Sequence, residues 1–200
     1  EQYVDFDVFL AADLHRIVTR YGMDFSLSVG SINADPNACV RLHFIPAEIR
    51  PDYLGHGSVK PIVYIASESV ANDVGTDQLH TLPIDVGARE ADTVYCDHQT
   101  ILIDAINHAG VVNAEPAEKG AGSIMAGISK LQSCDIYIAP DCTVAIDEFT
   151  NLKWETDRHG RIKRPLRPDP KCDDHTVDGA RYALSGLQVG TSRTEGVTML

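Results

Sequence analysis

The sequence predicts an α/β fold, and two observations support this prediction. In the second half of the chain, short apolar runs alternate with segments of helical period, which is the pattern of strands joined by helices. The 200 residues, 44% hydrophobic and 23% charged, have the composition of a globular protein and are enough to bury a sizeable core. We find neither an internal repeat nor a convincing linker, and therefore expect one domain.

The individual elements follow from the period of the apolar residues. The expected strands are a hairpin over 23–45 and single strands over 62–66, 93–96, 111–114 and 135–139. The expected helices cover 73–82, 99–109, 124–131, 142–149 and 175–187, and residues 5–21 are expected to form a helix or the tail of a preceding element. The apolar face expected for helix 99–109 consists of Ile101, Leu102, Ala105 and Ile106. Gly110 ends this helix, and Gly160 forms the turn of a second hairpin over 151–164.

Composition and simple motifs exclude several classes of protein. The formal net charge of −12 argues against a general attraction to nucleic acid or to anionic lipid. The longest apolar runs are a few residues, far below the roughly 20 that span a bilayer, so we expect no membrane segment. Five cysteines without a CxxC pair favour a reducing compartment. The glycine-rich stretch 119–123 lacks the Gly-Lys-[Ser/Thr] ending of a P-loop, so no ATPase site is expected in this segment.

Three acidic residues occupy positions where α/β folds place functional groups. Asp97 directly follows an apolar strand, Asp24 lies in a strand-like segment, and Asp178 follows His175 by three residues on one helix face. Clustered carboxylates repel one another, and divalent cations with a preference for oxygen, Mg²⁺ or Mn²⁺, remove that cost. The alternative for each acid is a simple role in a turn or as a helix cap.

Residues 151–171 carry seven basic side chains against three acidic ones, a net charge of +4 in an otherwise acidic chain. One interpretation is a hairpin edge that is kept basic so that it does not pair with other strands. The other is an arm that contacts phosphates, with Trp154 and His159 as stacking groups.

Several motifs, in order and at the expected spacing, resemble the C-terminal nuclease domain of the large terminase subunit of tailed phages. The C-terminal motifs are Lys119–Leu131, Ile136–Ile138, Asp141-Cys142, Ile146–Phe149, Trp154 and His175–Ala183. Upstream, Tyr95–Asp97, Gly22–Asp24 and Asp35–Ala38 resemble the segments that carry the family's other acids. The resemblance covers nearly the whole chain, from Tyr21 to Leu187.

This resemblance implies an RNase H-like fold, in which helices flank a mixed central sheet. It implies an endonuclease that uses two Mg²⁺ or Mn²⁺ ions to cut concatemeric double-stranded viral DNA when packaging begins and ends. Two alternatives remain open. One is another RNase H-like nuclease, such as a resolvase or a transposase core, and the other is a non-catalytic acidic docking module.

The resemblance also implies roles for individual residues. The implied metal ligands are Asp24, which would bridge both ions, Asp97, Asp178 and, as a candidate fourth acid, Asp35. His175 would be a nearby helper in catalysis, and Glu68 would support the site or the fold. The implied DNA contacts are Lys119, Arg158, Arg161, Lys163 and Arg164.

The same resemblance implies an organisation and a set of partners. Residues 1–20 would connect to a missing N-terminal ATPase domain of the same polypeptide, residues 21–188 would form the nuclease domain, and residues 189–200 would be a flexible tail. The partners would be viral DNA, the portal protein and the small terminase subunit. The protein would act in the cytoplasm of the host cell, at the portal of the assembling procapsid.

Overall fold

The structure of the chain is a computed structural model, and it describes residues 2–10, 26–31, 37–49, 59–72, 74–90, 92–97 and 99–186. Asp24, Asp35 and the tail 189–200 lie outside the described residues. Within these ranges, no helix has both the length and the apolar character needed to cross a bilayer.

A mixed sheet forms the centre of the described fold. Its strand order is β1-β7-β4-β3-β2-β5-β6. The strands are β1 (Asp7–Leu10), β2 (Ser26–Ser31), β3 (Asn37–Ile45), β4 (Ile62–Ala71), β5 (Thr93–Cys96), β6 (Asn113–Pro116) and β7 (Asp135–Ile138). β3 is antiparallel to both of its neighbours, whereas all other neighbouring strands are parallel. The expected mixed sheet is therefore confirmed.

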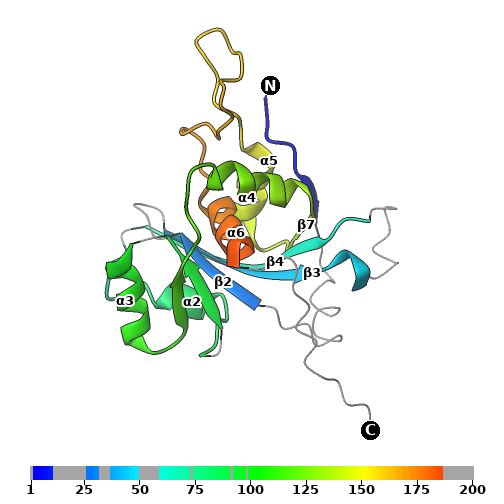
Figure 1. Ribbon diagram of the computed structural model, residues 1–200. Helices are drawn as coiled ribbons and strands as arrows, with labels where there is room; N and C mark the ends of the chain where they lie inside the picture. The colour runs from blue at the N-terminus through cyan, green and yellow to red at the C-terminus, as the bar shows by residue number, and fades with distance from the viewer. Residues whose placement is uncertain are drawn as a thin grey trace.

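Helices cover both faces of this sheet (Figure 1). They are α2 (Thr81–Asp85), α3 (Thr100–Ala109), α4 (Ser123–Gln132), α5 (Thr143–Asn151) and α6 (His175–Gly186), with a 3-10 turn η1 over Ala47–Ile49. α6 lies on β2, β3 and β5 and packs against α4 and α5. α2 and α3 lie on the opposite face (Figure 1).

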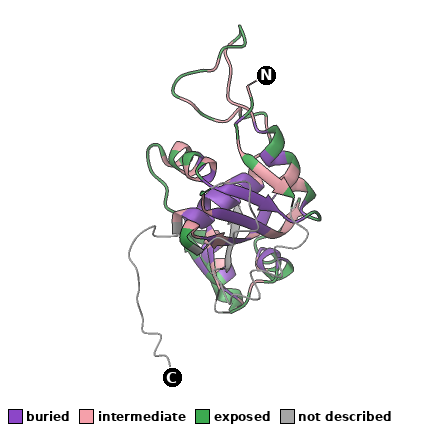
Figure 2. Ribbon diagram, turned by 90° about the vertical axis from the view of Figure 1, so that its right-hand side faces the viewer, coloured by how far each residue is buried: buried purple, intermediate pink, exposed green. Residues whose placement is uncertain are grey.

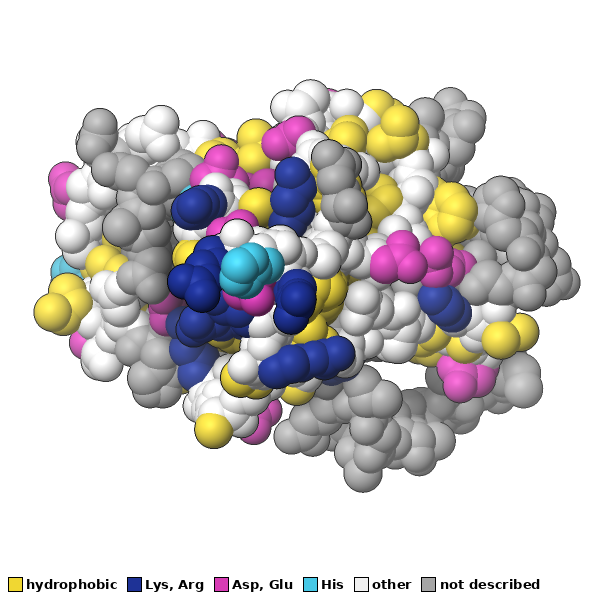
Figure 3. All heavy atoms as spheres, turned by 90° about the horizontal axis from the view of Figure 1, so that it is seen from above, with side chains coloured by type: hydrophobic (Ala, Val, Ile, Leu, Met, Phe, Trp, Pro, Cys, Tyr) yellow, Lys and Arg dark blue, Asp and Glu magenta, His cyan; other side chains and the backbone are white. Residues whose placement is uncertain are grey.

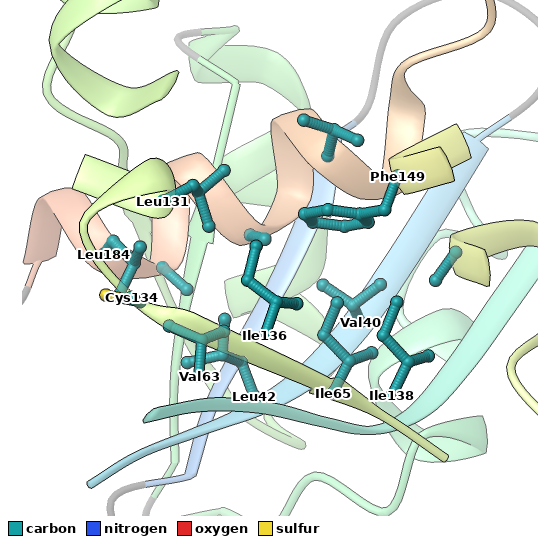
Figure 4. Packing of buried hydrophobic residues seen from close by; sticks show 14 of the residues in the cluster. Val40, Leu42, Val63, Ile65, Leu131, Cys134, Ile136, Ile138, Phe149 and Leu184 are labelled. Atoms are coloured by element: carbon teal, nitrogen blue, oxygen red, sulfur yellow. The ribbon is translucent and has the colours of Figure 1, made fainter. Parts of the chain in front are cut away.

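The main core lies between the central strands and the layer of α4, α5 and α6 (Figures 2 and 4). Alternate residues of a strand point to the same face, so each central strand contributes side chains two positions apart. These fully buried pairs are Val40 and Leu42 of β3, Val63 and Ile65 of β4, and Ile136 and Ile138 of β7. Leu131, Phe149 and Leu184 close the core from the three helices. This packing fixes α6 on the sheet, and α6 carries two of the expected site residues.

The expected helix over 5–21 is wrong over its described part. Residues Asp7–Leu10 form β1, which pairs in parallel with β7 in the register Asp7 to Asp135. Phe9 stacks on Tyr137 with ring centroids 5.0 Å apart. The strand is stabilised by a partner more than 120 positions away, which the local period of apolar residues cannot reveal.

The expected helix over 73–82 is also wrong. Residues 76–80 form turns, and α2 begins at Thr81 and includes Pro83. Proline is tolerated in the first turn of a helix because the N–H groups there have no partner within the helix. Pro83 therefore lies near the start of a helix and does not end one.

Three smaller expectations also need correction. The strand expected over 62–66 continues to Ala71, so Glu68 lies inside β4. β6 begins at Asn113, two residues later than expected. On α3, Ile103 and Ile106 are the buried residues, whereas Ile101 is 77% exposed. The remaining assignments, β3, β5, α3, α4, β7, α5 and α6, agree with expectation to within two residues at each end.

The expected second hairpin is present but extends beyond residue 164. Antiparallel bridges join Thr156 to Ile162 and Trp154 to Pro168, and Gly160 has φ of 75° at the turn. This arm, residues 153–168, projects beside the N-terminus (Figure 1), where Tyr3 forms a bridge with Lys153.

Candidate active site

A pocket of about 390 Å³ opens where the end of β5, the glycine-rich loop before α4 and the first turns of α6 meet. Its walls are Asp97, Lys119, Gly120, Ser123, Ile124, Asp174, His175, Asp178, Arg181 and Tyr182. The fold thus brings together four residues that the sequence singled out, namely Asp97, Lys119, His175 and Asp178.

Asp97 is positioned by the strand that precedes it. Val94 and Cys96 of β5 are buried in a second cluster with Ile103 and Ile106 of α3. Asp97 follows at the strand end with only 4% of its surface exposed. Lys119 forms an ion pair with its Oδ1 atom. Burial opposes the ammonium form of Lys119, but hydrogen bonds to Asp97 and Tyr182 outweigh it and raise the lysine pKa above its usual value. Asp97 is therefore a buried carboxylate with a cation beside it.

Asp178 lies on the first turn of α6 and is held by residues of the same helix. Its Oδ1 accepts hydrogen bonds from Nε and Nη2 of Arg181, with the Nε donor at 2.9 Å. Its Oδ2 accepts one from the Tyr182 hydroxyl at 3.3 Å. Residues three and four positions apart share a helix face, which explains why both partners reach Asp178.

A third carboxylate, that of Asp174, lines the same pocket. Burial first, and then the charge of Asp178, raise the pKa of Asp174 to about 6, although His175 and Arg181 oppose the shift. Several acids therefore crowd one pocket, and this arrangement favours a cation.

Glu148 of α5 fixes the start of α6. Its Oε2 accepts hydrogen bonds from the Thr176 amide at 2.7 Å, the Thr176 hydroxyl at 2.5 Å and the Val177 amide at 3.4 Å. Because the first amides of a helix have no partner within it, a buried carboxylate is a strong anchor there. The position of His175 and Asp178 thus depends on α5.

The chain order around β2 bears on the two acids outside the described residues. β2 and β5 are parallel, and Gly30 is in register with Cys96, the residue before Asp97. The end of β2 at Ser31 therefore lies beside the end of β5 that leads into Asp97. In the sequence, Asp35 follows this end of β2, whereas Asp24 precedes the start of the strand.

The donors in the pocket fit a hard divalent ion. Asp97, Asp174 and Asp178 offer carboxylate oxygens, which Mg²⁺ and Mn²⁺ prefer, and the described lining of the pocket contains no cysteine. Within the described part of the chain, no three His, Cys, Asp or Glu side chains are close enough together to hold a metal ion. A full ligand set therefore needs a further group.

The basic residues of the arm form a separate surface. Arg158, Arg161, Lys163 and Arg164 are exposed and do not line the pocket. Lys163 and Arg167 pair with Glu155, and Nε of Arg158 donates to Nε2 of His159 at 3.0 Å. Seen from the side on which the arm projects, Lys and Arg side chains gather around a histidine (Figure 3).

Glu68 has a clear structural contact. Its two carboxylate oxygens accept hydrogen bonds from the amides of Val144 at 2.9 Å and Ala145 at 2.8 Å. The carboxylate thus caps the first turn of α5 from inside β4.

Three residues of the pocket were not predicted as part of the site. They are Arg181, Tyr182 and Asp174, which the sequence indicates only as a helix cap. The spacing of Arg181 and Tyr182 from Asp178 on a helix was a usable signal.

Comparisons with known proteins agree with this geometry. The family described as Terminase RNAseH like domain matches residues 63–186. The Mn-bound nuclease domain of the g2p large terminase from bacteriophage SPP1 is 25% identical with a TM-score of 0.68, covering 92% of this chain and 98% of that one. The P22 large terminase nuclease domain is 17% identical with a TM-score of 0.56, covering 80% and 79% of the two chains.

A longer protein shares the same fold. The large terminase of a thermophilic bacteriophage, in complex with ADP, is 17% identical with a TM-score of 0.55, and the match covers 82% of this chain and 40% of that one. No curated protein sequence matches the chain. The expected RNase H-like fold is confirmed by these matches.

Proposed function

Because the chain belongs to the Terminase RNAseH like domain family, we propose that it is a metal-dependent endonuclease that cuts concatemeric double-stranded viral DNA when packaging starts and ends. The observation that carries the proposal is the meeting of Asp97 and Asp178 in one pocket. The SPP1 nuclease domain, similar over nearly its whole length, contains bound Mn.

In this proposal Asp97 and Asp178 hold two Mg²⁺ or Mn²⁺ ions together with a third carboxylate. Bound divalent ions would supply activation of water and stabilisation of charge on the attacking and leaving oxygens. The carboxylates bind and orient the ions, and Arg181 and Tyr182 orient Asp178. His175 lines the same pocket and is proposed as a helper beside the carboxylates.

Asp24 and Asp35 are both candidates for the third carboxylate. The resemblance of the sequence to the terminase nucleases favours Asp24 as a bridging ligand. The parallel register of β2 and β5 favours Asp35, because it follows the strand end that lies beside Asp97. Separate Asn variants of the two residues distinguish these assignments.

The proposal extends to partners. The longer terminase of the thermophilic bacteriophage is in complex with ADP and is matched by this chain over 40% of its length, which supports an ATPase domain in the same polypeptide. We further propose that the portal protein and the small terminase subunit are partners, in the cytoplasm of the host cell. Lys119 and the arm residues Arg158, Arg161, Lys163 and Arg164 are proposed to contact DNA.

The test is cleavage of supercoiled and linear plasmid with Mn²⁺, with Mg²⁺ and with EDTA. We expect Mn²⁺- or Mg²⁺-dependent cleavage by the wild type, and its loss in Asp97→Asn and Asp178→Asn with the circular dichroism spectrum retained. Asp104→Asn removes an exposed acid on α3 and serves as the matched control, with full activity expected. The proposal fails if the wild type does not cut with either ion, or if both site variants cut as fast as Asp104→Asn.

The same assay assigns the third carboxylate. Loss of cleavage in Asp35→Asn alone assigns the role to Asp35, and loss in Asp24→Asn alone assigns it to Asp24. Loss in both would make both residues ligands. Full activity in both variants would contradict a cluster built from three or more carboxylates.

A further inference from the structure

A second hollow, of about 510 Å³, continues from the candidate active site between α4 and α6. We call it the α4–α6 groove. It shares part of its wall with the active-site pocket, including Lys119, Gly120 and Arg181. A chain that enters the active site can therefore continue into the groove without leaving the protein surface.

Three basic side chains line the groove in a protein that is strongly acidic. They are Lys119, Lys130 and Arg181, and the one acidic lining residue is Glu118. Lys119 and Arg181 also pair with Asp97 and Asp178 of the adjoining pocket. Lys130 reaches across from α4 and donates to the Leu184 carbonyl of α6. Basic side chains along a groove attract an anion such as a phosphate group.

The loop at the mouth of the groove leaves room for a close approach. A Cβ atom at Gly120 or Gly122 would meet no atom within 4 Å, so both positions face open space. Ala126, one turn further along α4, is also exposed and lines the groove. Short side chains allow another backbone to approach the loop and the helix.

We infer that the α4–α6 groove binds the sugar–phosphate backbone of the DNA strand next to the cleaved phosphate. The inference rests on the proposed nuclease function and adds a surface that the ligand cluster does not include. Contacts to phosphates fix the register of a nucleic acid without reading its sequence, so we expect no dependence on base sequence.

The test places opposite charges at one lining position and at a matched position outside the groove. Ala126→Glu and Ala126→Lys change the charge in the groove. Ser129→Glu and Ser129→Lys make the same changes at an exposed position of α4 that lines neither hollow. Glu and Lys are good helix formers, so all four proteins should fold. Binding of a fluorescent DNA duplex is measured by anisotropy in EDTA at low salt, where no cleavage occurs.

We expect Ala126→Glu to bind about tenfold more weakly than Ser129→Glu, and Ala126→Lys to bind more tightly than Ser129→Lys. The difference should shrink as salt is added. Equal effects on DNA binding at Ala126 and Ser129 would overturn the proposal, since they would reflect only the change in net charge. If the wild type cuts plasmid but the Ala126 and Ser129 variants bind DNA equally, the proposal for the groove is wrong and the proposed nuclease function is retained. If the Ala126 and Ser129 variants differ in DNA binding but no ion supports cleavage, the proposed nuclease function is wrong and the groove is retained as a DNA-binding surface.

Discussion

Arg181 holds Asp178 while its own side chain lies directly against Gly127 of the neighbouring helix. A Cβ atom at Gly127 would be 3.0 Å from Cδ of Arg181 and 3.1 Å from its Cγ. Arg181 is only 6% exposed, so it has little room to move aside. The place of the Asp178 carboxylate therefore depends on the absence of a side chain on α4.

Replacing Arg181 by Met should lower the stability of the fold and make that stability depend more strongly on a bound divalent ion. Asp178 would lose its cation in a partly buried site, and we expect a loss of about 2–4 kcal/mol in unfolding free energy without metal. Mn²⁺ should then raise the melting temperature of the variant more than that of the wild type. Arg158→Met, on the exposed arm, is the control. An equal Mn²⁺ effect in Arg181→Met and wild type would contradict this expectation.

Gly127→Ala separates stability from positioning. Alanine in place of glycine favours a helix by about 1 kcal/mol, so the fold should be retained. The added Cβ must displace Arg181 and, through it, Asp178, and we expect cleavage to fall about tenfold to a hundredfold with weaker Mn²⁺ binding. Ser129→Ala, exposed on the same helix, should leave both properties unchanged. Normal cleavage and normal Mn²⁺ affinity in Gly127→Ala would show that this contact does not position Asp178.

The parts of the site that local sequence could reveal are those set by one element. The sequence predicts Asp97 at the end of an apolar strand and Asp178 on a helix face with His175. Both predictions follow from the spacing of apolar residues and from the residues that begin and end each element. The spacing of Asp178 and Arg181 is equally local. Helix α6 itself was predicted closely for the same reason.

The remaining features depend on pairings between distant residues. Lys119 meets Asp97 across 22 positions, and Glu68 meets Val144 across 76. Strand β1 forms because it pairs with β7, although the spacing of Phe6 and Phe9 is also compatible with a helix. Such contacts are decided by the packing of the whole sheet, so no window of residues contains them.

Glu68→Ala should destabilise the fold and leave Mn²⁺ binding unchanged. The amides of Val144 and Ala145 would lose their acceptor at the start of α5, and we expect a loss of about 1–2 kcal/mol in urea unfolding. Mn²⁺ affinity, measured by titration calorimetry below the unfolding range, should match the wild type. Glu68→Gln, which keeps one acceptor oxygen, should lie between the two in stability. A tenfold loss of Mn²⁺ affinity in Glu68→Gln would instead make Glu68 part of the metal site.

Glu148, which anchors α6, should give stability a pH dependence because its carboxyl group is buried. Burial raises the pKa of Glu148 above the usual 4.5, and the hydrogen bonds from Thr176 and Val177 only partly offset this. Its Oε1 is buried and has no hydrogen-bond partner among the described residues. Because the folded state favours the protonated acid, the stabilising contribution of Glu148 is complete below pH 4.5 and is lost as the pH rises through the folded pKa.

Glu148→Gln keeps the shape of the side chain and removes this titration. We therefore expect the variant to gain stability relative to the wild type as the pH rises from 4 to 8. Urea unfolding at each pH measures the difference, in which the titration of all other groups cancels. Glu148→Ala should lose stability at every pH, because the amides of Thr176 and Val177 then lack an acceptor. A constant difference between Glu148→Gln and wild type across this range would show that Glu148 does not titrate with a raised pKa in the folded protein.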